Sequence, residues 1–180
     1  MTTSLDLLDL VHAAILAAGT DADDRIYRPG DWPSQQSTAP QIKLRLLSEN
    51  RASISRSGAP QFTTTATIRA FLELQEPASE DDAGAGIAEA AVWKLKRQAE
   101  VAVVNSYPLM LQIQQIASIR AQFAFKAEAA MHLAMVVLDL DLEFYEGPDN
   151  FAPVLAEDLD EISLTATNYP PVTLTAGLTE

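Results

Sequence analysis

Three carboxylates at alternating positions are the strongest candidates for chemistry in this sequence. Asp139, Asp141 and Glu143 are separated by single leucines. On a β-strand, alternate side chains point to the same face, so these groups would lie about 7 Å apart along the chain. Oxygen clusters of this kind bind Mg²⁺ or Mn²⁺, and two-metal phosphoryl transfer uses them. We expect no lysine, arginine or histidine on this face to handle a phosphate, and therefore favour a solvated or lumen-lining acidic face over a metal site.

The nucleotide-binding motifs are incomplete. The segment Gly84-Ala-Gly86-Ile-Ala-Glu89 begins like a dinucleotide fingerprint, but Glu89 stands where a third small residue belongs. Three acidic residues precede it, and carboxylates there would repel a pyrophosphate. The Gly-rich lysine loop of nucleotide triphosphatases is absent from the sequence. This segment therefore predicts the start of a helix, with no nucleotide cofactor.

The remaining polar residues also fall short of a catalytic set. Asp21, Asp23 and Asp24 lack the glycine and the closing glutamate of a calcium loop in the required register. His12 and His132 occur without a nucleophilic serine motif, and the chain has no cysteine. We therefore predict that the protein is not an enzyme and that it uses neither a cofactor nor a metal.

Several cationic and aromatic residues are candidates for a protein interface. Tryptophan and arginine are common interface anchors, so Trp32 with Arg25 and Arg28 could form a recognition patch. An alternative of equal weight is that Trp32 covers the edge of a sheet. Arg51 and Arg56 lie in a polar connection, residues 48 to 58, which is a second candidate contact element.

The charge of the chain argues against nucleic-acid binding. The formal net charge of the 180 residues is −13, and residues 131 to 180 contain ten carboxylates and no lysine or arginine. Affinity for nucleic acid comes from cations that neutralise phosphates, so this part of the chain would repel a duplex. No apolar run approaches the roughly 20 residues that cross a bilayer, and we expect a soluble protein that is cytoplasmic when made.

Hydrophobic periodicity predicts an α+β protein. We expect an antiparallel sheet of about four strands, with two or more helices packed on one face, in a domain spanning residues 1–155. An acidic C-terminal arm, residues 156–180, would follow, with a possible strand at 172–174. The expected helices are 5–19, capped by Ser4, and 86–104; the expected strands are 25–27 (short), 41–46, 62–75, 119–126 and 134–145.

Four short phrases of the sequence resemble a known group of phage proteins. They are Arg28-Pro-Gly-Asp-Trp-Pro33, Pro40-Gln-Ile-Lys-Leu44, Gly58-Ala-Pro-Gln-Phe-Thr-Thr-Thr65 and Leu142-Glu-Phe-Tyr-Glu-Gly147. In this order they look like the tail terminator or minor tail (tail completion) proteins of long-tailed bacteriophages and prophages. The resemblance spans about residues 5 to 155 and provides no catalytic residue.

The resemblance implies a structural virion protein. Such a protein forms a homo-hexameric ring on the last ring of the tail tube, stops tube polymerisation and contacts the neck or head-completion protein. It would reside at the head-proximal end of the tail, and in the host cytoplasm during assembly. DNA would pass through the ring without specific binding. The alternatives are a neck or head-to-tail connector protein, a monomeric binding module with an acidic face, and a metal-dependent phosphoryl-transfer enzyme that uses Asp139, Asp141 and Glu143.

Overall fold

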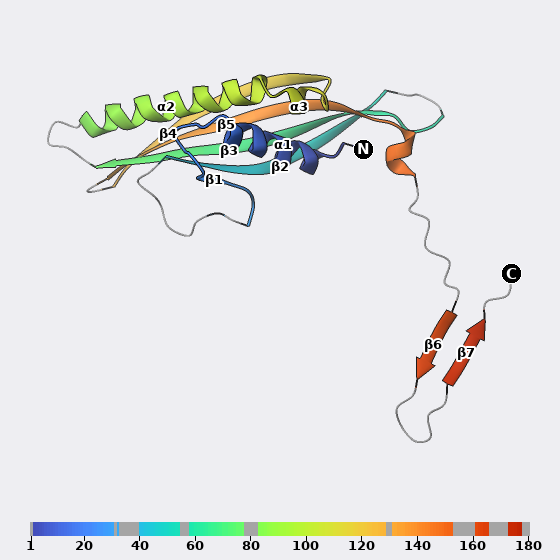
Figure 1. Ribbon diagram of the computed structural model, residues 1–180. Coiled ribbons are helices and arrows are strands. Elements are labelled where there is room, and N and C mark those ends of the chain that lie inside the picture. Colours follow the sequence, from blue (N-terminus) through green and yellow to red (C-terminus); the bar gives the residue numbers. More distant parts are fainter. Residues whose placement is uncertain are drawn as a thin grey trace. The chain divides into compact units, whose positions relative to one another are not determined.

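The computed structural model describes residues 2–30, 32, 40–54, 58–77, 83–128, 131–152, 161–165 and 173–177. The chain forms two compact units, Met1–Asn150 and Phe151–Glu180. The first contains a mixed set of helices and strands (Figure 1), which confirms the expected α+β class. The sequence suggested a division five residues later, after residue 155.

The larger unit is built on a five-stranded sheet in the order β1-β2-β3-β5-β4. The two-residue β1 pairs in parallel with β2, and all other pairs are antiparallel. Each of the five strands coincides with an expected segment, and the short β1, expected at residues 25–27, brings the sheet from about four strands to five. The strands are β1 (Ile26–Tyr27), β2 (Gln41–Ser53), β3 (Phe62–Pro77), β4 (Gln115–Glu128) and β5 (Met131–Glu146).

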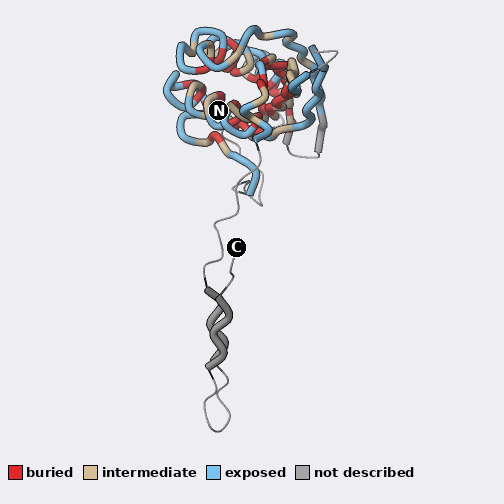
Figure 2. The backbone as a smooth tube through the Cα atoms, turned by 90° about the vertical axis from the view of Figure 1, so that its right-hand side faces the viewer, coloured by how far each residue is buried: buried red, intermediate tan, exposed pale blue. Residues whose placement is uncertain are grey.

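The core lies between one face of this sheet and the helices. Even-numbered residues of β3 and β5, such as Ile68, Leu72 and Leu138, are fully buried, while most of their odd-numbered neighbours are half-buried. Alternation with a period of two places the even residues on one face, as the sequence predicts. In Figure 2 the buried residues gather inside the larger unit, between its strands and helices.

Helix α1 (Ser4–Ala17) begins with a capping box. The Thr3 hydroxyl accepts a hydrogen bond from the Asp6 amide (3.2 Å), and the Asp6 carboxylate accepts one from the Thr3 amide (2.8 Å). The cap is thus Thr3 and not Ser4, because Ser4 is already helical and its hydroxyl bonds to Glu49 instead. Gly19 follows the helix with φ +61°, a conformation that glycine adopts without strain.

Helix α2 (Ala83–Val104) lies across β3 and β5. Its apolar stripe includes Val92, Leu95 and Val103, which are buried against the sheet, as the period of 3.6 residues predicts. A further short helix, α3 (Tyr107–Met110), follows within three residues and was not expected from the sequence. Helix α1 covers β2 and contacts both α2 and α3, so the three helices form one layer.

Two β-bulges extend strands beyond their expected limits. The register between β2 and β3 shifts at Leu47, and that between β4 and β5 shifts at Ala117. A bulge inserts one residue and reverses which residues face the core. Strict alternation is lost there, so the sequence pattern stopped at residue 46 in β2 and began only at residue 119 in β4.

The smaller unit contains an antiparallel hairpin of β6 (Glu161–Thr165) and β7 (Thr173–Gly177), preceded by a 3₁₀ turn, Pro148–Phe151. The sequence suggested a strand near residues 172–174 but not a partner for it. The arm expected to be extended therefore carries a two-stranded hairpin.

Two glycines of α2 differ sharply in their surroundings, and this generates a paired prediction. A Cβ added at Gly84 would lie 2.4 Å from the Pro77 carbonyl oxygen, whereas one at Gly86 would meet nothing within 4 Å. We expect Gly84→Ala to lower the free energy of unfolding by about 1–3 kcal/mol through overpacking. Gly86→Ala should raise it by about 0.5–1 kcal/mol, because alanine favours the helix.

Urea denaturation of both variants tests this contrast. Equal effects of the two substitutions would contradict the close approach of Gly84 to β3. The contrast also gives Gly84 a structural role: it allows the helix to begin beside the end of a strand.

Candidate functional site

The face of the sheet opposite the helices, which we call the open face, carries a set of paired charges. Its residues come from β2, β3, β5 and β4, and the strand register places them opposite one another: Arg69 faces Asp139, and Asp139 in turn faces Arg120. Among the described residues, no helix covers this face. Its charged members are Lys43, Arg45, Arg69, Glu73, Arg120, Asp139, Asp141 and Glu143.

Arg69 and Asp139 form a bidentate ion pair across β3 and β5. The Arg69 Nε and Nη2 atoms donate to the two Asp139 carboxylate oxygens at 2.7 and 2.8 Å. The Asp139 carboxylate raises the pKa of Arg69, first through these hydrogen bonds. The Asp139 side chain is only 14% exposed, so its charge is compensated by Arg69 more than by water.

Asp141 is the best-connected carboxylate of the open face. It accepts hydrogen bonds from Thr67 Oγ1 (2.7 Å) and Ser118 Oγ (2.6 Å), and Arg120 Nη1 lies 2.9 Å away. Burial alone would raise the pKa of Asp141, but the hydrogen bonds from Ser118 and Thr67 and the charge of Arg120 outweigh burial and lower it. This carboxylate is therefore held in its ionised form by three neighbours on two strands.

The same pattern continues toward β2. Lys43 Nζ and Gln41 Nε2 donate to Glu73 Oε2 at 2.8 and 2.9 Å, and both side chains of the Lys43–Glu73 pair are at most 15% exposed. At the other end of the sheet, Gln115 donates to Glu143 at 3.2 Å. Among the residues whose side chains the structure describes, the open face thus has four cations and four carboxylates, and their formal charges sum to zero.

This neutrality corrects our expectation of an acidic face at Asp139, Asp141 and Glu143. The three do share one face, but Arg69 and Arg120 lie on that face too, contributed by the flanking strands. Our statement that no cation is available there is therefore wrong. No three metal-ligating side chains converge anywhere in the part of the chain that the structure describes.

A second ion cluster lies on the helix side, where β2, β3 and β5 extend beyond α1. Arg51 Nε donates to the buried Glu146 at 2.7 Å, and Thr64 donates to the same carboxylate. Burial alone would raise the pKa of Glu146, but the hydrogen bonds from Arg51 and Thr64 outweigh burial and lower it. Arg51 also pairs with Glu49 at 2.7 Å. Arg51 therefore joins β2 to β5 while its side chain stays 43% exposed, and its role in a protein interface stays a prediction.

The other proposed interface residues are not gathered into one patch. Arg25 bonds to the carbonyl of Pro40 (2.8 Å) and pairs with Asp23, while Arg28 pairs with Asp9 of α1 at 2.6 Å. Arg56 lies outside the described residues. The structure thus uses Arg25 and Arg28 to fix the segment around β1.

Trp32 packs on the open face near the β2 edge of the sheet. Its ring meets Phe71 edge-on at 5.7 Å between centroids, and the cations of Lys43 and Arg45 lie 5.9 and 6.0 Å from it. Of the two alternatives for Trp32, covering of the sheet is the one that these contacts favour.

The weaker candidates have structural partners. The Asp21 carboxylate pairs with Lys94 of α2 at 2.8 Å, and the Asp21 backbone amide donates to Gln98 at 2.9 Å. A ring nitrogen of His12 lies 3.1 Å from the Ile26 carbonyl oxygen. His132 is buried and stacks on Phe125, with 5.5 Å between ring centroids. These contacts link neighbouring elements of the fold.

The most exposed apolar surface of the sheet lies on its edge strand β4. Helix α2 covers β3 and β5, and the helix-side residues of β4 project past it. Trp93 of α2 stacks on Phe123 (6.2 Å), and Phe123 on Phe125 (6.4 Å). We call this surface the aromatic ledge; its members and their exposed fractions are Trp93 38%, Ile119 39%, Phe123 37% and Phe125 42%.

Strand β4 also has a free edge. It is the last strand in the sheet order and pairs with β5 alone among the described strands. A free edge presents unpaired backbone donors and acceptors, and so offers a template for another strand. The ledge and the free edge lie on the same strand, which combines apolar area with backbone hydrogen-bonding capacity.

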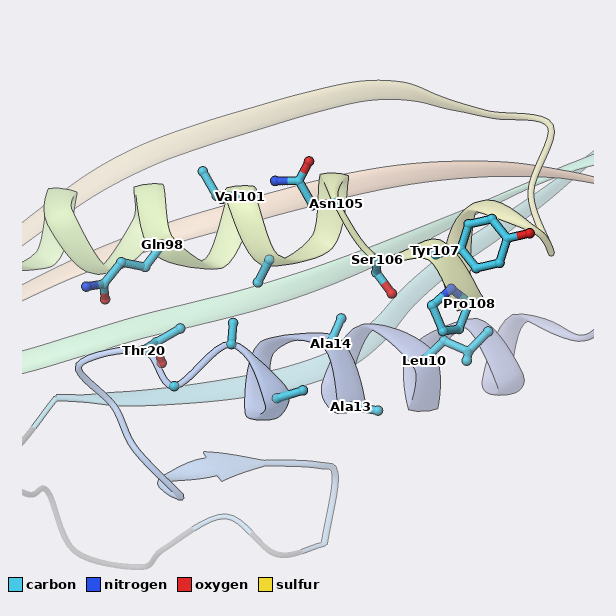
Figure 3. Close-up of a pocket in the computed structure, with 14 residues that line it drawn as sticks. Leu10, Ala13, Ala14, Thr20, Gln98, Val101, Asn105, Ser106, Tyr107 and Pro108 are labelled. Carbon is cyan, nitrogen blue, oxygen red and sulfur yellow. The ribbon is translucent and has the colours of Figure 1, made fainter.

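A groove of about 650 Å³ separates the C-terminal halves of α1 and α2 and ends at α3. Figure 3 shows Ala13 and Ala14 of α1 on one side, Val101 and Asn105 of α2 on the other, and Tyr107 and Pro108 at one end. Its lining, which lies wholly within the described residues, contains no carboxylate, histidine, lysine or arginine. The groove therefore has a mostly apolar lining and no group suited to acid–base chemistry near neutral pH.

Sequence reasoning missed the aromatic ledge, although its pattern was available. The alternation over residues 119–126, which places Phe123 and Phe125 on one face, predicted the strand correctly. The missing information was that β4 is an edge strand that α2 does not cover. That follows from the strand order, which periodicity does not encode.

The comparisons with known proteins give no family for this chain. No protein-family model matches the sequence, and no curated protein matches it as a relative. What the chain does must therefore follow from its residues and their arrangement.

The ionised state of Asp141 and Glu146 predicts how stability depends on pH. A carboxyl whose pKa is lowered in the folded state stabilises the protein above its unfolded pKa, and this contribution is lost as the pH falls through the folded value. We expect the free energy of unfolding to fall between about pH 5 and pH 2. Asp141→Asn should be less stable than the wild type at pH 7, with a difference that shrinks over this range.

Urea titrations at several pH values measure this effect, with Glu89→Gln on the exposed side of α2 as the control. The control should keep the wild-type pH dependence. A difference between Asp141→Asn and wild type that stays constant down to pH 2 would contradict the assigned hydrogen bonds.

Proposed function

We propose that this chain is a structural assembly protein of a tailed bacteriophage, of the tail terminator kind. In this proposal it forms a ring, the hexamer that the resemblance implies. The ring caps the tail tube, stops its polymerisation and contacts the neck or head-completion protein. Its place is the head-proximal end of the tail, after assembly in the host cytoplasm. A neck or head-to-tail connector protein is the nearest alternative.

The coincidence of a free strand edge and an aromatic ledge on β4 is the observation that carries this proposal. Ring-forming proteins need an interface that joins identical copies in a head-to-tail order that closes. Six chains would together carry a formal charge of −78 (6 × −13), so apolar and strand-to-strand contact must offset their repulsion. The ledge and edge of β4 offer both kinds of contact.

The paired charges of the open face support a conduit in preference to an enzyme. Asp139 and Asp141 are engaged by Arg69 and Arg120, so binding a cation or a phosphate there would require an ion pair to break. A face with equal numbers of the two signs also holds DNA weakly, because it offers few uncompensated cations to phosphates. DNA passage without specific binding fits such a surface.

Electron microscopy of the purified chain tests the proposal. We expect closed rings, with a particle mass near 117 kDa for six chains of 19.5 kDa each. Light scattering over a range of protein concentrations and salt provides the mass in solution. A monomer at all concentrations, with no ring formed on isolated tail tubes, would contradict the proposal.

Calorimetric titration with Mn²⁺ tests the phosphoryl-transfer alternative independently. We expect no stoichiometric binding, because the carboxylates of the open face already have cationic partners. Binding of one or two ions per chain that Asp141→Asn abolishes would instead favour an enzyme.

A further inference from the structure

The paired positions of the β6–β7 hairpin alternate between apolar and polar residues. The register pairs Ile162 with Ala176 and Leu164 with Leu174, so these four positions share one side of the hairpin. The other side has Ser163 opposite Thr175 and Thr165 opposite Thr173. The described part of the unit Phe151–Glu180 contains no further strand, and no helix beyond the end of the 3₁₀ turn, to cover the apolar side. An isolated two-stranded hairpin is marginally stable in water, so this one requires a partner surface.

The aromatic ledge and the free edge of β4 have the properties that such a hairpin needs. The ledge offers exposed aromatic rings, and the edge offers backbone groups for strand addition. Adding a strand to β4 would satisfy the edge and set alternate apolar residues of the added strand against Phe123 and Phe125. Polar residues of the added strand would then continue the open face.

The charges of the two surfaces are complementary. Helix α2 and strand β4 contain five of the twelve cationic residues and three carboxylates, but Lys94 and Arg120 pair with Asp21 and Asp141 from other elements. Residues 153–180 contain five carboxylates and no lysine or arginine, a net charge of −5. Arg97 on α2 is 74% exposed, and its separation from the Glu100 carboxylate is a long 3.6 Å, so it retains capacity to pair with an incoming carboxylate. Arg97, one helical turn from Trp93 of the ledge, is therefore a cation that a carboxylate of the acidic arm could meet.

We infer that the β6–β7 hairpin of one copy docks on the aromatic ledge of a second copy and extends its sheet at β4. The inference rests on the proposed function, because copies in a ring stand side by side and each would supply one hairpin and one ledge. In a closed head-to-tail ring every ledge is then covered and every hairpin is seated. The acidic arm thus links neighbouring copies of the chain.

Crosslinking between single-cysteine variants tests this docking, since the chain has no native cysteine. One preparation carries Phe123→Cys and the other Leu164→Cys, and the two are mixed with a short bismaleimide linker that tolerates a small shift in register. We expect a covalent heterodimer of 39 kDa, twice 19.5 kDa, on a denaturing gel. Phe125→Cys replaces Phe123→Cys as a second ledge variant if thermal melting shows that the first is poorly folded.

The matched control is Asn50→Cys, an exposed position on the open face of β2. Mixed with Leu164→Cys, it should give at least a tenfold weaker heterodimer band than the ledge variant; this threshold is about 1.4 kcal/mol in relative occupancy. Equal yields from the two positions, or no heterodimer from either ledge variant, would overturn the inference. A hairpin that docks on the ledge of its own chain would also give no heterodimer, and this outcome would overturn the inference.

Electron microscopy of the uncrosslinked wild type separates this inference from the proposed function. Rings without ledge-specific heterodimers would leave the ring protein standing and overturn the docking of the hairpin. Ledge-specific heterodimers without rings would support the docking and overturn the ring.

Discussion

A single layer of helices covers one face of a five-stranded sheet, and on the last strand, β4, it leaves Ile119, Phe123 and Phe125 partly exposed. Burial of apolar surface drives the packing of α1 and α2 on β2, β3 and β5, where side chains such as Ile42, Leu72 and Leu138 are fully buried. No described helix lies on the opposite face, and the aromatic residues of β4 are only partly covered. The rest of the molecule's surface chemistry follows from this incomplete cover.

On the open face, which no described helix covers, charged and polar side chains pair across neighbouring strands. The antiparallel register places Arg69 and Arg120 on either side of Asp139. Arg69 pairs with Asp139 and Arg120 pairs diagonally with Asp141, so the charges of these strands compensate one another. The helix side of the edge strand β4 differs from the open face, because its aromatic residues remain partly exposed. The charges of the open face are paired with one another, and the aromatic residues of the ledge are exposed. Such surfaces are suited to contact with other proteins more than to chemistry on a bound substrate.

Periodicity predicted the local structure well, because both the helical and the strand patterns record which side of an element meets the core. The alternation of residues 134 to 144 placed Asp139, Asp141 and Glu143 on one face correctly. The same reasoning failed wherever the answer depended on pairing between distant segments. Arg69 is seventy residues from Asp139 in sequence, and no local pattern indicates that β3 and β5 are neighbours. The neutrality of the open face and the exposure of the aromatic ledge both depend on that strand order.

Hydrogen–deuterium exchange of the β4 amides at varied protein concentration tests most directly whether β4 is the surface through which copies meet. Amides of β4 that point away from β5 have no strand partner in the single chain described. The account predicts that they exchange rapidly in dilute protein and become protected as the concentration rises, while the amides of β3 stay protected throughout. Rapid exchange along the outer edge of β4 in a sample that has assembled would contradict it.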